Sequence, residues 1–367
     1  MTQSASSDGA PHGETPPAAR HRNVRWLWLA GLLLATLFAG CSDSTSNDGP
    51  IPTATVSLQA DGATPGASVA ARPSAGCSQA PPPAGLSEET LTVGADAGPY
   101  RQMVPSAAAE QKPLPLIIDL HGLGGTAADQ ALVTEFETLG EQQGAFVLTP
   151  DGLGPDRKID LDFLTRLLDA SEQRLCVDTA RVFMDGMSLG GITTSTVGCQ
   201  LTDRVAAIGL VSGLAFPGEC ELSRPLPVMV FFGKLDTVLQ YYGGAGYSLT
   251  HEGPAPPPPT APSAETQGSP PVETVVAQWA AANGCLTEPE TTQVSPHVEL
   301  RTFGGCAGGS AVEFYVISDG QHVWPGANLE TFNRRCPDCR ALGFQPTQEI
   351  KATPLLWDFW MQHPLAN

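Results

Sequence analysis

Charged residues are scarce in this sequence, and basic residues are the scarcest. Only 16% of the 367 residues are charged, and 19 Lys and Arg stand against 38 Asp and Glu, which gives a formal net charge of −19. Nucleic acid and anionic membrane surfaces attract basic proteins and repel a protein of this charge. The composition therefore argues against both as main partners and favours a soluble, acidic surface.

Long hydrophobic runs are also lacking, and the one candidate lies near the N-terminus. The apolar run from Trp26 to Phe38 follows several arginines and is short for a bilayer-spanning helix. Such a run, ending in small residues and a cysteine, is typical of a bacterial lipoprotein signal, in which Cys41 becomes the lipidated N-terminus. We therefore predict a signal peptide over residues 1–41 and an exported protein, lipid-anchored at the cell envelope or secreted. An uncleaved anchor helix is the alternative.

Two stretches have little hydrophobic periodicity and are rich in Pro, Ala and Ser. Residues 42–84, which also contain many Gly and Thr, cannot bury enough apolar surface to offset the entropy of ordering and are predicted to be a flexible tether. Residues 248–271, including the run Pro256 to Pro259, are predicted to be a surface insertion. The sequence thus predicts one domain over residues 85–367.

Zinc-binding cysteine patterns are lacking as well. Cys336 and Cys339 form a single C-x-x-C with no second pair or histidine cluster nearby, so a structural disulfide is favoured over metal or redox chemistry. We therefore predict no metal site.

The cysteine count agrees with export. The chain has 9 Cys, and setting Cys41 aside leaves an even number that could form up to four disulfides, with about 105 possible pairings. Proximity in the sequence favours Cys285 with Cys306 and Cys199 with Cys220.

Short apolar runs alternate with amphipathic stretches along most of residues 85–367. The stretch from Asp160 to Leu175 repeats apolar residues at helical spacing, and a second helix is predicted around Ala128 to Gln143. The most apolar runs are predicted strands: Pro115–Leu120, Ala145–Thr149, Val182–Asp185, Ala206–Val211, Leu226–Phe232 and Phe314–Ile317. Strands that alternate with helices of this length predict an α/β fold with a mostly parallel sheet.

A glycine-flanked serine stands at one of the strand-to-helix turns. The run Gly186-Met187-Ser188-Leu189-Gly190 matches G-x-S-x-G and follows the strand that ends at Asp185. Short glycine and serine patterns recur by chance, but a serine at a strand-to-helix turn is held in a strained conformation with its hydroxyl projecting. Ser188 is therefore a candidate nucleophile.

A serine nucleophile needs a base, and the seven histidines can be screened for one. His322 is the histidine that lies in a glycine-containing loop directly after a late strand. The others lie in the leader, the glycine loop, the Pro-rich stretch, before a strand or at the chain end: His12, His21, His121, His251, His297 and His363. Asp236 also follows a strand, and the order Ser188, Asp236, His322 is that of the α/β-hydrolase triad. A helix cap or turn for Asp236 and a structural role for His322 are the alternatives.

A glycine-rich loop, His121-Gly122-Leu123-Gly124-Gly125, follows another buried strand. Its backbone N–H groups can point at an anion, and it resembles the HGGG-type loop that supplies half of an esterase oxyanion hole. A plain tight turn is the alternative.

Several segments together resemble a known family. DLHGLGG, PDGLG, CVDTARVFMDGMSLGG, FFGKLDTVLQYYGG, NGC and GQHVWPG are similar to segments of the exported polyhydroxybutyrate depolymerase and feruloyl esterase-like α/β hydrolases. The resemblance covers roughly residues 85–364 and implies a single-domain α/β-hydrolase fold. It implies that Ser188 is the nucleophile, His322 the general base and Asp236 the residue that orients it. The backbone N–H groups of Leu123 and Leu189 would form the oxyanion hole, and no cofactor is required.

The function expected from these features is hydrolysis of a carboxylic ester, either in a polyester or in a hydroxycinnamoyl ester on plant polysaccharide. A serine peptidase of the same fold and a catalytically silent surface-binding module are the alternatives. Tyr241, Tyr242 and Trp324 are candidate cleft aromatics, with packing in the core as the alternative for each. We expect a monomer that meets the membrane through its lipid anchor only.

Overall fold

The computed structural model describes residues 69–154, 158–218, 220–244, 269–335 and 344–366. The predicted signal peptide with Cys41, the tether up to residue 68, most of the Pro-rich insertion and the Cys336/Cys339 pair lie outside these residues. Within them, every helix is too short or too polar to span a bilayer.

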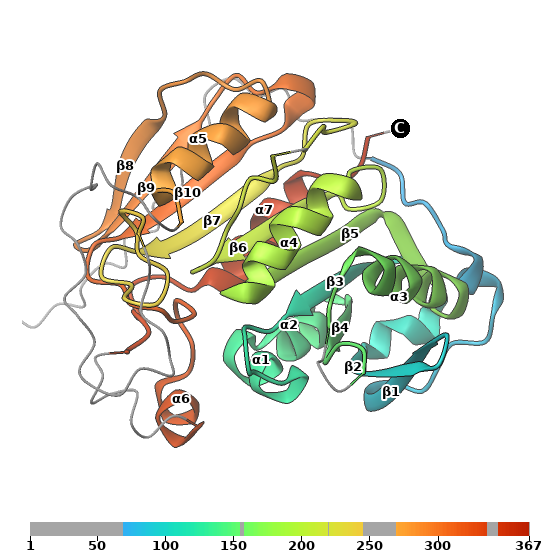
Figure 1. Cartoon of the computed structure of the whole chain (residues 1–367). Helices are drawn as coiled ribbons and strands as arrows, with labels where there is room; N and C mark the ends of the chain where they lie inside the picture. Colours follow the sequence, from blue (N-terminus) through green and yellow to red (C-terminus); the bar gives the residue numbers. More distant parts are fainter. Residues whose placement is uncertain (1–68, 155–157, 219, 245–268, 336–343, 367) are drawn as a thin grey trace, which may run out of the picture. The chain divides into compact units, whose positions relative to one another are not determined.

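One sheet runs through the described domain (Figure 1). Its strands, in chain order, are β1 (Gly85–Val93), β2 (Asp96–Val104), β3 (Leu114–Leu120), β4 (Phe146–Pro150), β5 (Val177–Met187), β6 (Ala207–Val211), β7 (Val228–Gly233), β8 (Glu290–Ser295), β9 (Val298–Phe303) and β10 (Val312–Ile317). The order across the sheet is β1-β2-β4-β3-β5-β6-β7-β10-β9-β8. In this order, the neighbouring strands from β4 through β3, β5, β6 and β7 to β10 pair in parallel. The strands β1, β2, β8 and β9 add antiparallel edges. The predicted α/β-hydrolase fold is confirmed.

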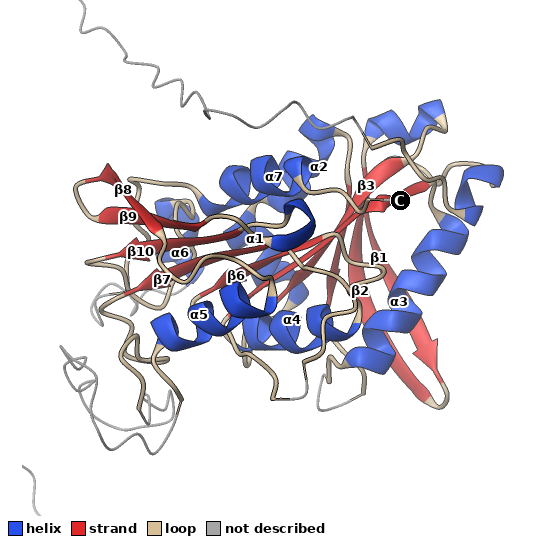
Figure 2. Cartoon of the chain, turned by 90° about the horizontal axis from the view of Figure 1, so that it is seen from above, coloured by secondary structure: helices blue, strands red, loops and turns tan. Residues whose placement is uncertain are grey.

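Helices cover both faces of the sheet (Figure 2). The α-helices are α1 (Ala127–Thr134), α2 (Phe136–Gln143), α3 (Leu161–Arg174), α4 (Leu189–Gln200), α5 (Val272–Ala282), α6 (Leu329–Arg335) and α7 (Ala352–Gln362), and short 3₁₀ helices are η1 (Ala75–Ser78), η2 (Ser106–Glu110) and η3 (Ala307–Gly309). One hydrophobic cluster packs α3, α4 and α5 on one face, and a second packs α2 and α7 on the other. The central strands are buried on both sides, which explains their continuous apolar sequences.

The helix predicted around Ala128 to Gln143 is two helices. Glu135 has a φ of 57°, in the left-handed region, and its N–H donates to the carbonyl of Ala131, which ends α1. Helix α2 then begins at Phe136, whose fully buried ring stacks on Trp360 of α7 with centroids 5.5 Å apart. Apolar periodicity did not predict the break, because it depends on the conformation of one backbone residue.

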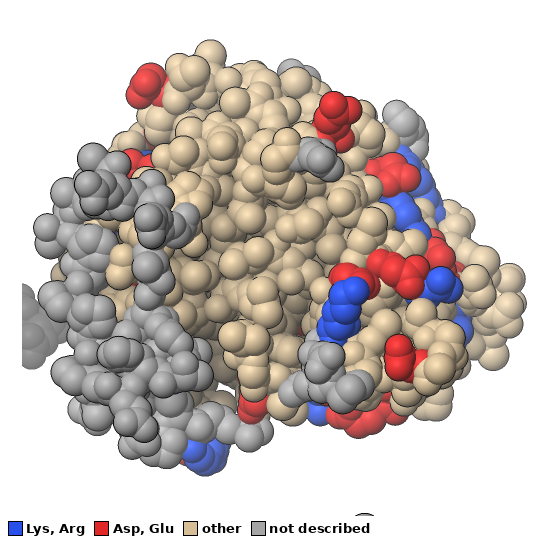
Figure 3. All heavy atoms as spheres, viewed as in Figure 1, with Lys and Arg blue, Asp and Glu red and all other residues tan. Residues whose placement is uncertain are grey.

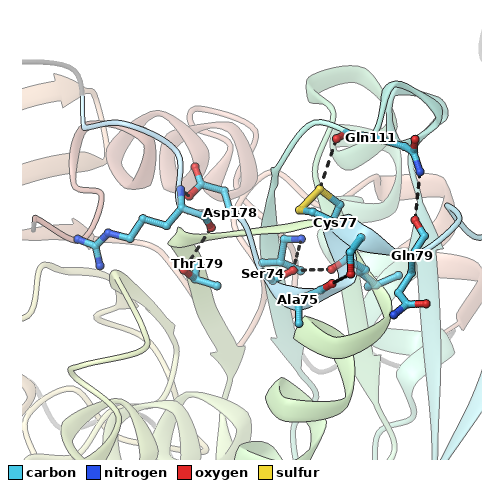
Figure 4. The surroundings of a disulfide bond; sticks show 12 residues. Ser74, Ala75, Cys77, Gln79, Gln111, Asp178 and Thr179 are labelled. Atoms are coloured by element: carbon cyan, nitrogen blue, oxygen red, sulfur yellow. Dashed lines mark hydrogen bonds between the residues drawn. A yellow bond between two sulfur atoms is a disulfide. The ribbon is translucent and has the colours of Figure 1, made fainter.

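The tether predicted over residues 42–84 ends earlier than Ala84. Ser74 donates its backbone N–H to the carbonyl of Val177 at 2.9 Å and its hydroxyl to that of Leu175 at 2.7 Å (Figure 4). Nearby, Cys77 forms a disulfide with Cys176, just before β5. Residues 69–84 therefore belong to the domain. Their composition resembles a linker because backbone hydrogen bonds and one disulfide, rather than apolar side chains, hold them.

Three disulfides join described cysteines. Both pairs predicted from proximity, Cys199–Cys220 and Cys285–Cys306, are confirmed, each with a sequence separation of 21. The third, Cys77–Cys176, has a separation of 99 and could not be chosen from spacing alone. By restricting the unfolded chain, a disulfide closing so long a loop is expected to stabilise the fold by about 2–4 kcal/mol.

Candidate active site

Ser188 occupies a strained turn between β5 and α4. Its φ of 56° and ψ of −120° lie where residues other than glycine are rarely found. The turn is possible because glycines stand on both sides of the serine. A Cβ on Gly186 would lie 2.3 Å from the carbonyl carbon of Gly190, and a Cβ on Gly190 would lie 2.2 Å from the carbonyl oxygen of Leu120. The spacing of G-x-S-x-G is thus a requirement of backbone contact.

A glycine that the sequence did not single out supports the same turn from the segment just after β6. A Cβ on Gly213 would lie 2.0 Å from the carbonyl oxygen of Ser188, and one on Gly191 would lie 2.2 Å from that of Gly213. The N–H of Ser188 donates to the carbonyl of Val211 at 2.9 Å. In the sequence, a Ser-Gly pair directly after a predicted strand could have drawn attention to Gly213. Its role at the turn, however, depends on β6 lying beside β5.

Replacing Gly213 with alanine is expected to lower kcat about a hundredfold, because the added methyl group must push the backbone of Ser188 aside by more than an ångström. Gly304→Ala is the matched control, since a Cβ there meets nothing within 4 Å. Activity and melting temperature of both variants would be measured. Wild-type kcat in Gly213→Ala would contradict this role for the glycine.

Asp236 and His322 meet at the carboxyl ends of β7 and β10. Oδ2 of Asp236 lies 2.7 Å from Nδ1 of His322, and the carboxylate is fully buried. The other oxygen, Oδ1, accepts the backbone N–H groups of Val238 at 2.8 Å and Leu239 at 2.9 Å. Because a carboxylate accepts, Nδ1 of His322 donates, and Nε2 is left as the basic nitrogen. Asp236 therefore caps the following turn with Oδ1, as the alternative predicted, but its Oδ2 binds His322.

The loop after β3 passes directly against the serine. A Cβ on Gly122 would lie 3.1 Å from the Cβ of Ser188. Within the loop, Nδ1–H of His121 donates to the carbonyl of Gly122 at 2.8 Å, and the N–H of Gly125 donates to the same carbonyl at 3.0 Å. Leu189 is the first residue of α4, where a helix leaves N–H groups without an intrahelical acceptor. This arrangement brings the two predicted oxyanion residues, Leu123 and Leu189, beside Ser188.

An open cavity of about 500 Å³ lies at the candidate triad, although Asp236 is buried behind it. Ser188 and His322 line it, and most of its other lining residues are aliphatic. These are Leu123, Val133, Met187, Leu189, Ile192, Val238 and Leu239. A second cavity of about 810 Å³ shares Leu123 and Leu189 with the first. Beyond them its lining is mixed, with the charged side chains of Asp96, Lys158 and Asp160 among apolar ones such as Val93, Leu153 and Ile159. Ser188 thus lies in a mainly apolar cavity, and a larger cavity of mixed lining adjoins it.

The molecular surface shows where charge gathers. In Figure 3, Lys, Arg, Asp and Glu lie mainly over β1, β2 and α3, and the middle of that face carries few charges.

Among the described residues, no group of three or more His, Cys, Asp or Glu side chains could hold a metal ion.

Two of the three predicted cleft aromatics lie in the core. Tyr241 is 1% exposed and donates its hydroxyl to Glu273 at 2.6 Å. Trp324 is also 1% exposed, and its indole N–H donates to Thr353 at 3.1 Å. Tyr242 is half-buried against the ring of Tyr241, with centroids 5.0 Å apart. None of the three lines the cavity at Ser188. Burying these large rings between the sheet and the helices is more favourable than exposing them to solvent at the strand ends.

Apart from Leu123 and Leu189, the aliphatic residues that line the cavity were not predicted as site residues. Val238 and Leu239 follow Asp236 directly, and Val133 lies on α1. Their position next to the predicted acid was a signal that could have been used, while the contribution of α1 depends on tertiary structure.

Comparisons with known proteins point to esterases. Feruloyl esterase B of Piromyces equi is 28% identical over 240 residues, which cover 60% of this chain and 41% of that protein. A bifunctional acetylxylan esterase/xylanase of Neocallimastix patriciarum is 29% identical over 36% of this chain and 21% of its own length. Feruloyl esterase D of Neurospora crassa is 26% identical over 46% of this chain and 64% of its own.

The chain spans less than half the length of the first two of these relatives. No family model matches it. Among solved structures, the acetyl xylan esterase from Aspergillus awamori aligns with a TM-score of 0.45 and 15% identity, over 71% of this chain and 100% of that one. The curated relatives confirm the resemblance to feruloyl esterase-like α/β hydrolases that the sequence motifs indicated. The polyhydroxybutyrate depolymerase part of that resemblance stays a prediction.

Proposed function

We propose that this feruloyl esterase-like α/β hydrolase is an exported serine esterase that cleaves carboxylic esters through an acyl-enzyme. The observation that carries the proposal is that His322, 2.7 Å from the buried Asp236, lines one cavity with Ser188 at a strained strand-to-helix turn. A serine, a histidine and an aspartate at the same edge of the sheet are the residues that nucleophilic catalysis by a serine needs.

The mechanism follows from the polarity of each group. His322 accepts the hydroxyl proton of Ser188 at Nε2 while the serine oxygen bonds to the ester carbonyl carbon. The carbonyl oxygen becomes negative and accepts hydrogen bonds from the N–H groups of Leu123 and Leu189. As the carbon–oxygen bond to the alcohol breaks, His322 returns the proton to the leaving alcohol. Water, deprotonated by the same nitrogen, then attacks the acyl-enzyme, and the acid and free Ser188 are released.

The two cavities support a choice among the candidate esters. The aliphatic cavity at Ser188 fits a hydrocarbon or aromatic acyl group, whereas the adjoining one offers Asp96, Lys158 and Asp160 to hydroxyl groups. An apolar acid joined to a polar alcohol fits both. This favours a hydroxycinnamoyl ester on a polysaccharide over a polyester, and the relatives named for feruloyl and acetylxylan esters support the same choice.

The three described disulfides support an oxidising compartment, as expected of an exported protein. Lipidation at Cys41, attachment to the cell envelope through that lipid, and a monomeric state belong to the proposal as well.

The proposed function is tested by offering the purified full chain a set of esters and amides. The esters are p-nitrophenyl acetate and butyrate, methyl ferulate, feruloylated arabinose oligosaccharides and a polyhydroxybutyrate film, and p-nitroanilides serve as matched amides. We expect hydrolysis of the small esters and of the feruloylated sugars, with anilides untouched. Cleavage of anilides but not esters would identify a peptidase. A folded chain that cleaves neither would contradict the proposal.

The size of the acyl group should be controlled by Val133, which projects from α1 into the cavity at Ser188. Val133→Trp is expected to reduce kcat/KM for methyl ferulate about tenfold more than for p-nitrophenyl acetate, because the indole fills space that a larger acyl group needs. Leu132→Trp is the matched control, since Leu132 is 39% exposed on the same helix and does not line this cavity. Equal losses on both substrates would place the acyl group elsewhere.

A further inference from the structure

Two buried aspartates lie side by side beneath the candidate site. Asp119 on β3 pairs in register with Asp185 on β5, and both residues are fully buried. Asp119 is two residues before the oxyanion loop, and Asp185 is three residues before Ser188. No salt bridge to a Lys or Arg is found for either carboxyl group within the described part of the chain.

The two carboxyl groups have different surroundings. Asp119 accepts hydrogen bonds on both oxygens, from Nε2 of Gln130 at 2.6 Å and from the hydroxyl of Thr134 at 2.7 Å. Apart from Asp119 itself, neither oxygen of Asp185 has a hydrogen-bond partner among the described residues. An ionised carboxylate needs such donors when it is buried, so Asp119 is the member that ionises and Asp185 the member that keeps its proton.

Charge and burial act in the same direction on this pair. Burial raises the pKa of Asp119 to about 6 despite the hydrogen bonds it accepts from Thr134, Gln130 and Asp185. Burial, and then the charge of Asp119, raise the pKa of Asp185 well above its ordinary value. Glu137 of α2 is the charged group beyond the pair that acts on Asp119.

The other elements packed here contribute uncharged groups. Helix α1 supplies Gln130 and Thr134. From β6, Gly209 pairs in register with Asp185, and Leu356 of α7 packs over that glycine. Nothing on these elements offsets a second negative charge, so only a proton on Asp185 allows the two carboxyl groups to remain together.

The strands that carry the pair also carry the two halves of the candidate site, and their ends are in close backbone contact. A Cβ on Gly190 would lie 2.2 Å from the carbonyl oxygen of Leu120, and one on Gly122 would lie 3.1 Å from the side chain of Ser188. A displacement of β3 relative to β5 would therefore move the oxyanion loop relative to the nucleophile.

We propose that Asp185 is a positioning residue that stays protonated in the active protein, and that loss of its proton at alkaline pH drives β3 and β5 apart and removes the oxyanion loop from Ser188. The effect on catalysis rests on the proposed esterase function. The protonation of Asp185 does not, and it can be measured separately.

The expected pH dependence of stability follows from the retained protons. An aspartate in the unfolded chain loses its proton near pH 4, whereas the folded chain keeps the proton of Asp185 to much higher pH. The folded state then binds more protons than the unfolded state, so this residue's contribution to stability is largest below pH 4 and is lost as pH rises. Asp185→Asn keeps the shape and cannot ionise, which removes this loss.

The test compares wild type, Asp185→Asn and Glu313→Gln in the full chain between pH 5 and 10. Glu313 on β10 is the matched control, because burial raises its pKa to about 7 and it lies on neither β3 nor β5. We expect Asp185→Asn to keep kcat at pH 7 within about threefold, to move the alkaline loss of kcat upward by at least about one pH unit, and to flatten the fall of melting temperature with pH. Glu313→Gln should leave the alkaline limb of kcat unchanged.

Two outcomes would overturn the inference. In the first, Asp185→Asn matches wild type both in the alkaline loss of kcat and in the fall of melting temperature with pH. In the second, Glu313→Gln shifts the alkaline loss of kcat as much as Asp185→Asn does. If Asp185→Asn does not fold, Asp119→Asn removes the other charge of the pair and should shift the same limb. If no variant hydrolyses esters, the proposed function fails, and the melting temperatures alone decide whether Asp185 is protonated.

Discussion

Replacing Ser188 with alanine is expected to lower kcat for every cleaved ester by at least about a thousandfold while the chain still folds. The residue supplies the oxygen that bonds to the acyl carbon, and no other hydroxyl occupies its place at the end of β5. Alanine has the same backbone preferences, so it keeps the strained φ of 56° and the contact with Gly213. Initial rates with p-nitrophenyl butyrate and far-ultraviolet circular dichroism are sufficient to measure both effects.

Ser188→Gly separates the loss of the nucleophile from the strain. Glycine adopts a positive φ without cost, so this variant should be as inactive as Ser188→Ala but more stable than wild type by about 1 kcal/mol or more. Denaturant unfolding of the three proteins would show the difference. Residual activity within tenfold of wild type in both variants would exclude Ser188 as the nucleophile.

The candidate triad could be proposed from the sequence because each member follows its own apolar run. Parallel strands bring their carboxyl ends to one edge of the sheet, so Ser188, Asp236 and His322 come together once the strands are recognised. Local pattern and chain order were enough. The same holds for the two disulfides between cysteines 21 residues apart.

What the sequence could not predict depends on contacts between distant segments. Gly213 matters because β6 lies beside β5, and Val133 lines the cavity because α1 folds over the loop after β3. For Tyr241 and Trp324 the sequence left both the cleft and packing in the core open, and the structure places both rings in the core. Residues 69–84 were assigned to the tether because composition does not reveal backbone hydrogen bonds to β5.

Asp236→Asn is expected to lower kcat about ten-thousandfold, and the structure explains why the change is severe. The two N–H groups of Val238 and Leu239 point at one side-chain oxygen, so they hold the carbonyl of the new amide there. The amide NH₂ then faces Nδ1 of His322, which must become an acceptor and place its proton on Nε2. A protonated Nε2 cannot accept the hydroxyl proton of Ser188.

Asp178→Asn is the matched control for that variant, because Asp178 is also a buried aspartate with backbone donors but lies at the far end of β5 from Ser188. Its kcat should stay within about threefold of wild type, although its stability should fall with the loss of the ion pair to Arg181. A loss of less than tenfold in Asp236→Asn would mean that the tautomer of His322 is not set by this carboxylate. The buried pair would then be a structural contact, and His322 would act as the base for Ser188 without orientation by Asp236.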